Sequence, residues 1–419
     1  MQILAATRTP FTRMGSSLSA LSAAELGRHA VSALLTETGI DPAMLDEVII
    51  GCVCQPVDAA NIARVIALKS GIPISVPAVT VHRNCASGME SITTAAERMA
   101  AGRGGLYFVG GVDSMSNVPL LYRKSAVNKF AMLAKARSLG QKLGVLSSFR
   151  PADFSPVIGL KLGLSDPVFG LNMGETAEVL AREFNISREE QDIFAAGSQL
   201  KAAAGREFLN EEISPVHLRG KVIDTDDGIR EDSSAEKLAK LKPVFNRTTG
   251  TVTAGNSSQI TDGAVMMLVA TDEKAAELGI EPMGRLTGYA YTGCDPKRMG
   301  LGPVKAIAKA NRLTGLNLGD ADTIEINEAF AAQVLACRKA LSDPAYAELA
   351  GLEHSIGEIP EEKLNPHGGA IALGHPVGAT GSRLVYTALH QLHKNGGKRA
   401  LTSLCVGGGQ GAALWLETN

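Results

Sequence analysis

Strand-like and helix-like stretches alternate along the first 120 residues. Helical periodicity runs from Leu18 to Leu35 and from Asn61 to Lys69. Short apolar runs of strand length occupy Glu47–Gly51, Ala78–Val81 and Leu106–Gly111, and the apolar N-terminus is typical of a first strand. Strands that alternate with helices at this spacing predict an α/β layer with a mainly parallel sheet.

The alternation stops between residues 122 and 245. Residues 122–161 hold eight basic side chains against one acidic side chain, Asp153, with apolar residues on the other side of a helix-like stretch. Such a segment is typical of a solvated face, of a surface that docks on an anionic membrane or partner, or of a phosphate site. Further helices are predicted at 175–184 and 191–208. We interpret residues 122–245 as an inserted domain.

The later part of the chain repeats the earlier pattern. A strand pattern resumes at Gly250–Ser258 and leads into Ala264–Ala270, and Leu401–Gly411 is a strand with a glycine turn that precedes Ala412–Glu417. A predicted helix at Ser382–His393 is stopped by two glycines. These similarities predict a duplicated α/β domain, with residues 1–121 and 246–271 as the first half, 122–245 as the insert and 272–419 as the second half.

One turn combines this pattern with reactive chemistry. Cys85 follows an apolar extended run and precedes apolar residues at helical spacing, so it is expected at the start of a buried helix. Backbone N–H groups at a helix start favour the thiolate and are expected to lower the cysteine pKa. Cys85 is therefore a candidate nucleophile, whereas the alternative is a buried structural cysteine.

Composition narrows the class of protein. A length of 419 residues suits two or three domains. The formal net charge of −2 argues against nucleic-acid binding. The six cysteines have no spacing typical of a zinc site. In the absence of a recognisable leader or a long apolar run, we expect reduced thiols in the cytoplasm.

Three further stretches carry chemistry beside Cys85. They are Ile324–Gln333 around Asn327, Asn365–Gly378 around His375, and the glycine run that follows Cys405. Together with Cys85 they supply two thiols, an imidazole, a carboxamide and glycine-turn amides. These groups can form an acyl-thiol intermediate, move a proton and hold two oxyanions.

These motifs closely resemble those of the thiolases, the acetyl-CoA C-acyltransferases. The resemblance covers essentially the whole chain, from Arg8-Thr-Pro to Gly409-Gln-Gly, and its ordered motifs are Cys-Ala-Ser-Gly, Asn-Glu-Ala-Phe, Gly-His-Pro and Cys-x-Gly-Gly-Gly. It implies the thiolase fold, with two βαβαβαββ halves in a five-layer αβαβα sandwich and an inserted loop domain. It also implies thiolysis of 3-ketoacyl-CoA to acetyl-CoA and a shortened acyl-CoA, or the reverse Claisen condensation.

The resemblance assigns a role to each reactive residue. Cys85 takes the acyl group, His375 is the base that activates it, and Cys405 is the second acid or base. Asn327 positions a water that stabilises the enolate oxygen together with His375, and the N–H groups of Cys85 and Gly407 form the oxyanion hole for the thioester. No metal or redox cofactor is implied, because CoA and acyl-CoA are substrates. The CoA contacts carried over are Met173, Asn172, Arg230, Ser234, Ser258, Ala329 and Phe330.

Several features refine the resemblance. His82, Asn172 and His367 depart from the residues common in thiolases. Glu328 is expected to be structural. The alternative to a CoA contact for Arg230 is an ion pair with Asp226 or Asp227 on the surface. The insert resembles the thiolase β-subunits of fatty-acid β-oxidation complexes, which implies association with an α-subunit or a membrane surface through residues 122–161. Those subunits usually carry His at the position of Asn327, which counts against this subgroup.

The family implies a homodimer or a dimer of dimers. Alternative functions are a biosynthetic acetyl-CoA acetyltransferase that forms acetoacetyl-CoA, a ketoacyl synthase of the same fold, and a non-catalytic lipid-binding or scaffold subunit. The second cysteine, Cys405, argues against the synthase, and the complete set of four motifs argues against the scaffold.

Overall fold

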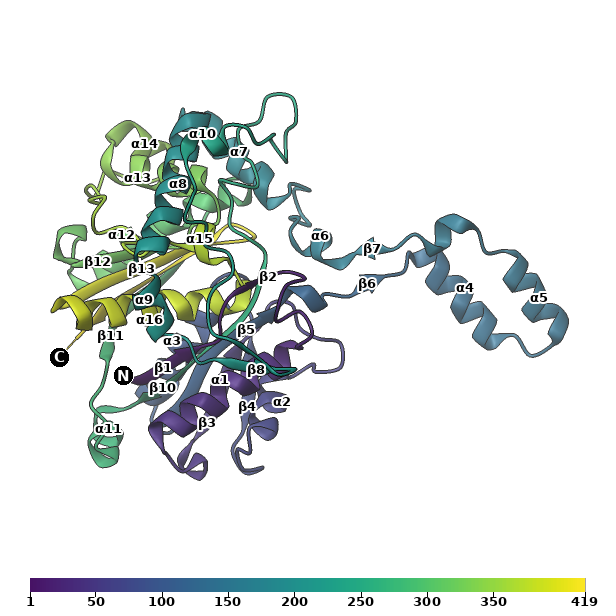
Figure 1. Cartoon of the computed structure of the whole chain (residues 1–419), viewed down its shortest axis with the longest axis horizontal. Helices are drawn as coiled ribbons and strands as arrows, with labels where there is room; N and C mark the ends of the chain where they lie inside the picture. Colours follow the sequence, from purple (N-terminus) through teal and green to yellow (C-terminus); the bar gives the residue numbers. More distant parts are fainter. Residues whose placement is uncertain (419) are drawn as a thin grey trace.

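The computed structural model describes residues 1–418, and its first half is built on a five-stranded sheet (Figure 1). The strand order is β4-β3-β5-β10-β1, in which β3 is parallel to β4 and β5, and β10 is antiparallel to β5 and β1. Helices α1 and α2 cover one face and α3 the other. The bounds are β1 Gln2–Arg8, α1 Ala23–Thr38, β3 Glu47–Gly51, α2 Ile62–Lys69, β4 Ala78–Val81, α3 Ser87–Ala100, β5 Leu106–Ser114 and β10 Thr261–Ala270.

The second half repeats this topology. Its strands follow the order β12-β13-β14-β11, with β12 parallel to β13 and β14 antiparallel to both of its neighbours. A parallel bridge between Ile324 and Leu364 stands where β4 lies in the first half. The predicted duplication is therefore visible strand by strand. The bounds are β11 Gly284–Gly293, α12 Gly302–Thr314, β12 Thr323–Ile326, α13 Ala331–Ser342, α16 Val377–Asn395, β13 Arg399–Val406 and β14 Gln410–Glu417.

Three apolar cores separate five layers. One core lies between α1, α2 and the first sheet, and another lies between the second sheet and the pair α12 and α13. The central core surrounds α3 and α16, which are enclosed between the two sheets. The sheets join edge to edge where Gln2 and Ile3 of β1 pair with β11. This arrangement is the predicted αβαβα sandwich.

The segment predicted as an insert has two parts with different surroundings. Residues 120–158 form an arm that projects from the body, with the short strands β6 Leu120–Leu121 and β7 Val157–Ile158 at its base and helices α4 Lys124–Lys135 and α5 Leu139–Ser147 at its end (Figure 1). Aromatic contacts hold the arm together, because Phe149 stacks on Phe154 and packs at a tilt against Phe130. The later helices α7 Met173–Glu183, α8 Arg188–Ala204, α9 Arg206–Glu211 and α10 Ala235–Leu238 return to the body.

Other short elements connect these parts. They are β2 Thr12–Arg13, α6 Gly159–Gly163, β8 Val216–Leu218, β9 Lys221–Ile223, α11 Asp272–Leu278, α14 Pro344–Leu349 and α15 Ala370–Leu373.

Four element predictions need correction. Helix α1 begins at Ala23 rather than Leu18, because Ser22 and Glu25 form a capping box there. The helix predicted over 191–208 is two helices that meet at Gly205. Helix α16 begins at Val377 rather than Ser382, since its glycines pack against α3, and this packing outweighs their low helix propensity.

The fourth correction concerns residues 250–258, which form a loop rather than a strand. Side chains satisfy its backbone: the Glu178 carboxylate accepts hydrogen bonds from the N–H groups of Thr251 and Val252, and Asn256 Oδ1 accepts one from Thr253 N–H at 2.7 Å. Side-chain partners of this kind compete with the strand ladder. The apolar and β-branched residues of this stretch resemble a strand in the sequence, but its backbone pairs with side chains instead of a neighbouring strand.

Candidate active site

Cys85 lies in a tight turn between β4 and α3. The Ala86 N–H donates to the Arg83 carbonyl at 2.9 Å, and the Ser87 N–H donates to the Asn84 carbonyl at 2.9 Å. Asn84 adopts a positive φ of 42°, a conformation that asparagine tolerates better than most residues. The turn places Cys85 two residues before the first residue of α3, so the prediction of a cysteine at a helix start is confirmed.

The pKa of the Cys85 thiol differs from the prediction. Burial raises this pKa, while hydrogen bonds from the N–H groups of Gly407 and of Cys85 itself lower it, and the Asp113 carboxylate raises it. The net shift is upward, so the predicted lowering is wrong. The reason is that removal from water disfavours the thiolate more than two backbone donors stabilise it. Cys85 consequently needs a base to become a nucleophile.

His375 lies between α15 and α16 with a neutral, oriented imidazole. Burial, followed by the charge of Arg383, lowers its pKa to about 4. The Nδ1 atom lies 2.6 Å from the hydroxyl of Thr380, and that hydroxyl donates its own hydrogen to the Pro376 carbonyl at 3.0 Å. Nδ1 must therefore donate to Thr380, which leaves Nε2 with a free lone pair. The arrangement suits a general base.

Contacts between glycines bring the Cys85 and His375 turns together. Gly88 lies three residues after Cys85 and Gly378 three residues after His375, and a Cβ atom at Gly88 would lie only 3.0 Å from the Gly378 carbonyl oxygen. The buried carboxylate of Asp113 joins the same region, because it accepts hydrogen bonds from Gly378 N–H at 2.6 Å and from Val53 N–H at 3.0 Å. The two turns are thus fixed against each other across the central layer.

Cys405 and Gly407 approach from the second half. Cys405 lies near the end of β13, and the glycine run at 407–409 turns the chain into β14. Burial raises the pKa of the Cys405 thiol strongly, and the nearby Cys85 raises it further. The Gly407 carbonyl accepts a hydrogen bond from Asn84 Nδ2 at 2.7 Å. The second thiol and the glycine turn therefore belong to the same site as Cys85.

Asn327 follows β12, beside the end of β13. Its N–H donates to the Ser403 carbonyl at 3.0 Å, and its side chain is fully buried. Neither Oδ1 nor Nδ2 of Asn327 has a hydrogen-bond partner within residues 1–418. A buried carboxamide with both polar atoms unused is rare in proteins and is suited to hold a polar ligand atom.

Glu328 next to Asn327 has the structural role that the sequence predicts. Its buried carboxylate accepts hydrogen bonds from Ser198 at 2.6 Å, from Asn365 Nδ2 at 2.8 Å and from the Ile371 N–H at 3.2 Å. These bonds connect α8, the loop after β12 and α15. Glu328 thereby fixes the backbone on both sides of the candidate site.

The candidate CoA contacts fall into two groups. Met173, Ala329 and Phe330 share one apolar cluster with Cys405, and the Ser258 N–H donates to the Ala329 carbonyl at 2.9 Å. The structure thus places Met173, Ala329 and Phe330 beside the second thiol, with Ser258 next to Ala329. By contrast, the Asn172 and Ser234 side chains cap helices α7 and α10, where each accepts a hydrogen bond from a backbone N–H. Both side chains therefore stabilise a helix N-terminus in the protein without bound CoA.

Arg230 does not form the ion pair considered as its alternative use. Asp226 pairs with Arg8 at 2.8 Å, and Asp227 pairs with Arg13 at 3.4 Å. Within the part of the chain that the structure describes, Arg230 takes part in no ion pair. Its guanidinium is therefore available to an anionic ligand.

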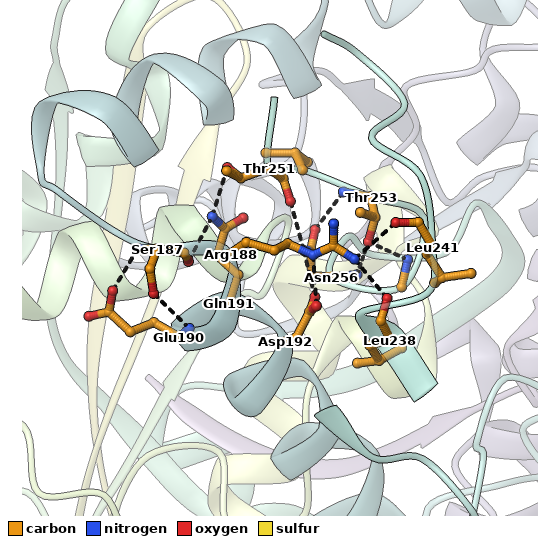
Figure 2. Close-up of polar contacts among 12 residues, drawn as sticks. Ser187, Arg188, Glu190, Gln191, Asp192, Leu238, Leu241, Thr251, Thr253 and Asn256 are labelled. Atoms are coloured by element: carbon orange, nitrogen blue, oxygen red, sulfur yellow. Dashed lines mark hydrogen bonds and ion pairs between the residues drawn. The ribbon is translucent and has the colours of Figure 1, made fainter. Parts of the chain in front are cut away.

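A polar network supports the loop that carries Ser258. Figure 2 shows how side chains at the start of α8 reach this loop: Gln191 donates to the Thr251 hydroxyl at 2.9 Å, and Asp192 accepts from Asn256 Nδ2 at 3.0 Å. Arg188 binds Asp192 at 2.7 Å and the carbonyls of Leu238 and Leu241. Helix α8, α10 and the loop are consequently held as one unit beside residues 329 and 330.

Comparison with known proteins identifies the chain. The family model described as the thiolase N-terminal domain matches residues 1–273, and the one described as the thiolase C-terminal domain matches residues 280–418. The chain belongs to the thiolase family. As a thiolase it is an acyltransferase, and it acts on CoA thioesters without a cofactor.

Individual thiolases and relatives match along nearly the whole chain. A probable acetyl-CoA acyltransferase of Staphylococcus aureus strain COL is 41% identical over 418 residues, which cover 98% of this chain and 97% of the relative. The crystal structure of Bacillus anthracis acetyl-CoA acetyltransferase has a TM-score of 0.86 at 37% identity, and that of human mitochondrial 3-ketoacyl-CoA thiolase in complex with CoA has 0.87 at 36%. Each alignment covers 100% of this chain and 98% of the other.

Two general properties complete the description of this thiolase. Residues 1–418 contain no group of three or more His, Cys, Asp or Glu side chains able to hold a metal ion. In the same residues, every helix is too short or too polar to cross a membrane.

Sequence reasoning missed three residues that organise this thiolase site. Thr380 orients His375, Asp113 ties the His375 turn to the loop after β3, and Asn84 binds Gly407. A threonine in the first turn after the histidine was the visible signal for Thr380. Asp113 and Asn84 had no such signal, since their partners are distant in sequence.

The departures from common thiolase residues have local explanations. His82 Nδ1 accepts a hydrogen bond from the Asn84 N–H at 3.4 Å, so His82 supports the Cys85 turn. His367 stacks on Phe208 with a ring separation of 3.9 Å. Both residues therefore stabilise neighbouring structure.

Proposed function

We propose that this thiolase forms an acyl-enzyme on Cys85 with His375 as its base. His375 Nε2 takes the thiol proton while the sulfur attacks the 3-keto carbonyl, and the bond between Cα and Cβ breaks. Cys405 protonates the departing enolate of acetyl-CoA. The second CoA then gives its thiol proton to Cys405 and attacks the acyl group, and Cys85 recovers its proton from His375. Every proton is returned at the end of one cycle.

One observation carries this proposal: the glycine turn lies against the Cys85 turn, where the Gly407 carbonyl accepts a hydrogen bond from Asn84 Nδ2 at 2.7 Å. The backbone N–H groups of Gly407 and Cys85 both lower the pKa of the Cys85 thiol, and they are suited to stabilise the oxyanion of the thioester formed there. For the enolate oxygen, we propose that the unpaired Asn327 carboxamide holds a water beside His375 Nε2.

The proposed CoA site lies beside the apolar cluster of Cys405. Met173, Ser258, Ala329 and Phe330 line it, and Arg230 binds the phosphates or nucleotide of CoA. Asn172 and Ser234 contribute through atoms that helix capping leaves free. The human 3-ketoacyl-CoA thiolase crystallised with CoA supports a CoA site in this fold.

Thiolysis tests the proposal directly. The wild type should consume acetoacetyl-CoA and a long-chain 3-ketoacyl-CoA when CoA is present, and a series of acyl lengths will separate a degradative from a biosynthetic enzyme. Cys85→Ala should lose activity, whereas Cys54→Ala, which removes another partly exposed thiol, should keep it. Cys405→Ser should still accept an acetyl group from acetyl-CoA on Cys85 but fail at the carbon–carbon step. Normal turnover by Cys85→Ala would refute the nucleophile assignment.

The projecting arm supports a proposed association role. Its apolar side chains are widely exposed, including Leu139 at 75% and Met132 at 58%. The basic residues Lys124, Lys135 and Arg137 form no ion pair within residues 1–418, whereas Lys129 binds Asp153 at 2.6 Å. We propose that the arm docks on a β-oxidation α-subunit or an anionic membrane surface.

A charge variant of the arm tests this role. Replacing Lys124, Lys135 and Arg137 by glutamine should weaken binding to anionic vesicles and leave turnover unchanged. Lys129 is kept because its ion pair fixes the arm. If the variant binds vesicles and the partner as tightly as the wild type does, the proposal is contradicted.

The proposed setting is a cytoplasmic homodimer or dimer of dimers in fatty-acid β-oxidation. All six cysteines are free thiols, which suits a reducing compartment. Light scattering across protein concentrations distinguishes a monomer, a dimer and a tetramer.

A further inference from the structure

Asn84 connects the two halves of the duplicated fold at the reacting sulfur. It belongs to the first half and immediately precedes Cys85, yet its Nδ2 donates to the carbonyl of Gly407 in the second half at 2.7 Å. The backbone N–H of the same glycine is near enough to the Cys85 sulfur to lower the pKa of that thiol. The turn that carries the reacting sulfur therefore also binds Gly407 through its carbonyl.

The glycine turn needs such support. Gly408 and Gly409 have positive φ values of 85° and 80°, and three consecutive glycines carry no side chain that could restrict the backbone. Glycine has more accessible conformations than any other residue, so an unsupported run would lose its alignment readily. A hydrogen-bond donor is useful for catalysis only when it is aligned before the charge develops.

Asn84 itself is fixed in place. Its N–H donates to His82 Nδ1 at 3.4 Å, and its carbonyl accepts hydrogen bonds from the N–H and the hydroxyl of Ser87. Next to it, Arg83 donates to the Gln410 side chain at 3.2 Å, at the other end of the glycine turn. Two consecutive side chains thus hold both ends of the turn.

We propose that Asn84 is a positioning residue for the thioester oxyanion hole, in which it holds the Gly407 N–H against the carbonyl bonded to Cys85. This inference rests on the proposed acyl-Cys85 chemistry. The hole is then assembled from both halves of the chain, so its geometry depends on their packing rather than on one loop.

Two variants separate the hydrogen bond from the backbone conformation. Asn84→Gly keeps the positive φ without strain and removes the donor, and Asn84→Asp keeps the side-chain volume but turns an oxygen toward the Gly407 carbonyl. Loss of a whole oxyanion-hole donor costs about 10² to 10³ in rate, so loss of its alignment should lower kcat and the rate of Cys85 acetylation about tenfold. KM for the thioester should change little, because the bond acts on the reacting carbonyl.

The matched control is Asn185→Gly. Asn185 also has a positive φ, of 48°, and donates to the Tyr346 hydroxyl at 3.2 Å on the surface. Acetylation is followed by mass spectrometry of each protein after mixing with acetyl-CoA, and thermal unfolding shows whether the fold is retained. Slower acetylation in both Asn84 variants but not in Asn185→Gly supports the inference.

The acetylation assay distinguishes a failure of the Asn84 inference from a failure of the proposed function. Acetylation of Asn84→Gly at the wild-type rate would overturn the positioning role alone, since Cys85 would then be acylated normally. An absence of acetylated Cys85 in the wild type would refute the proposed function as well.

Discussion

A methyl group at Gly88 should separate the two reactive turns. A Cβ atom there would lie 2.7 Å from the Ser382 backbone nitrogen, whereas ordinary contact begins at 3.4 Å. The difference, 3.4 − 2.7 = 0.7 Å, is the displacement that Gly88→Ala requires between α3 and α16. Because the obstructing atom is backbone, no side-chain rotation can relieve the clash.

The displacement acts directly on the site, because Cys85 and His375 lie at the adjoining ends of these helices. A misplacement of about 1 Å can cost about 10² in rate, so kcat of thiolysis should fall by about one to two orders of magnitude. Overpacking a core also costs about 1–3 kcal/mol, which urea unfolding can measure. The variant should therefore lose activity while it remains folded.

The control for this experiment is Gly197→Ala in α8. A Cβ atom at Gly197 meets nothing within 4 Å, so this substitution should leave kcat unchanged and stabilise the helix by about 1 kcal/mol. An unchanged kcat in Gly88→Ala would refute the argument that this close helix contact sets the distance between the reactive turns.

Three further predictions follow from the buried polar groups. Thr380→Val should lower kcat about 10- to 100-fold, because Nδ1 of His375 loses its acceptor, whereas Thr380→Ser should keep activity; equal rates in the two variants would contradict this role. Since burial lowers the pKa of His375 to about 4, the acid limb of kcat/KM should lie near pH 4 rather than 6.5, and a midpoint near 6.5 would be the contrary result. Glu212→Gln should cost about 3 kcal/mol at pH 7, because it breaks a buried ion pair with Arg8. Burial alone would raise the pKa of Glu212, but the charge of Arg8 lowers it overall. As pH falls, the unfolded chain therefore binds this proton before the folded chain does, and the wild type loses stability. In urea unfolding, the difference in free energy of unfolding between Glu212→Gln and wild type should accordingly shrink as pH falls.

Local patterns in the sequence were sufficient for much of the architecture. The strand at Glu47–Gly51 and the strand at Ala78–Val81 have the predicted bounds, because short apolar runs between polar turns have few other ways to be buried. The loop at 250–258 was mistaken for a strand, since its partners are side chains from α7 and α8 rather than a neighbouring strand. Such partners are not visible within a short window of sequence.

The sequence by itself determined the family, the duplicated halves and the candidate residues Cys85, His375, Cys405 and Asn327, because these depend on residue identity and order. The tertiary structure decided the pKa values and the orientation of these groups. It determined that burial raises the pKa of the Cys85 thiol, that Thr380 orients His375, and that Asn84 binds the glycine turn. Protonation and alignment depend on surroundings assembled from distant parts of the chain, and for that reason no single motif contains them.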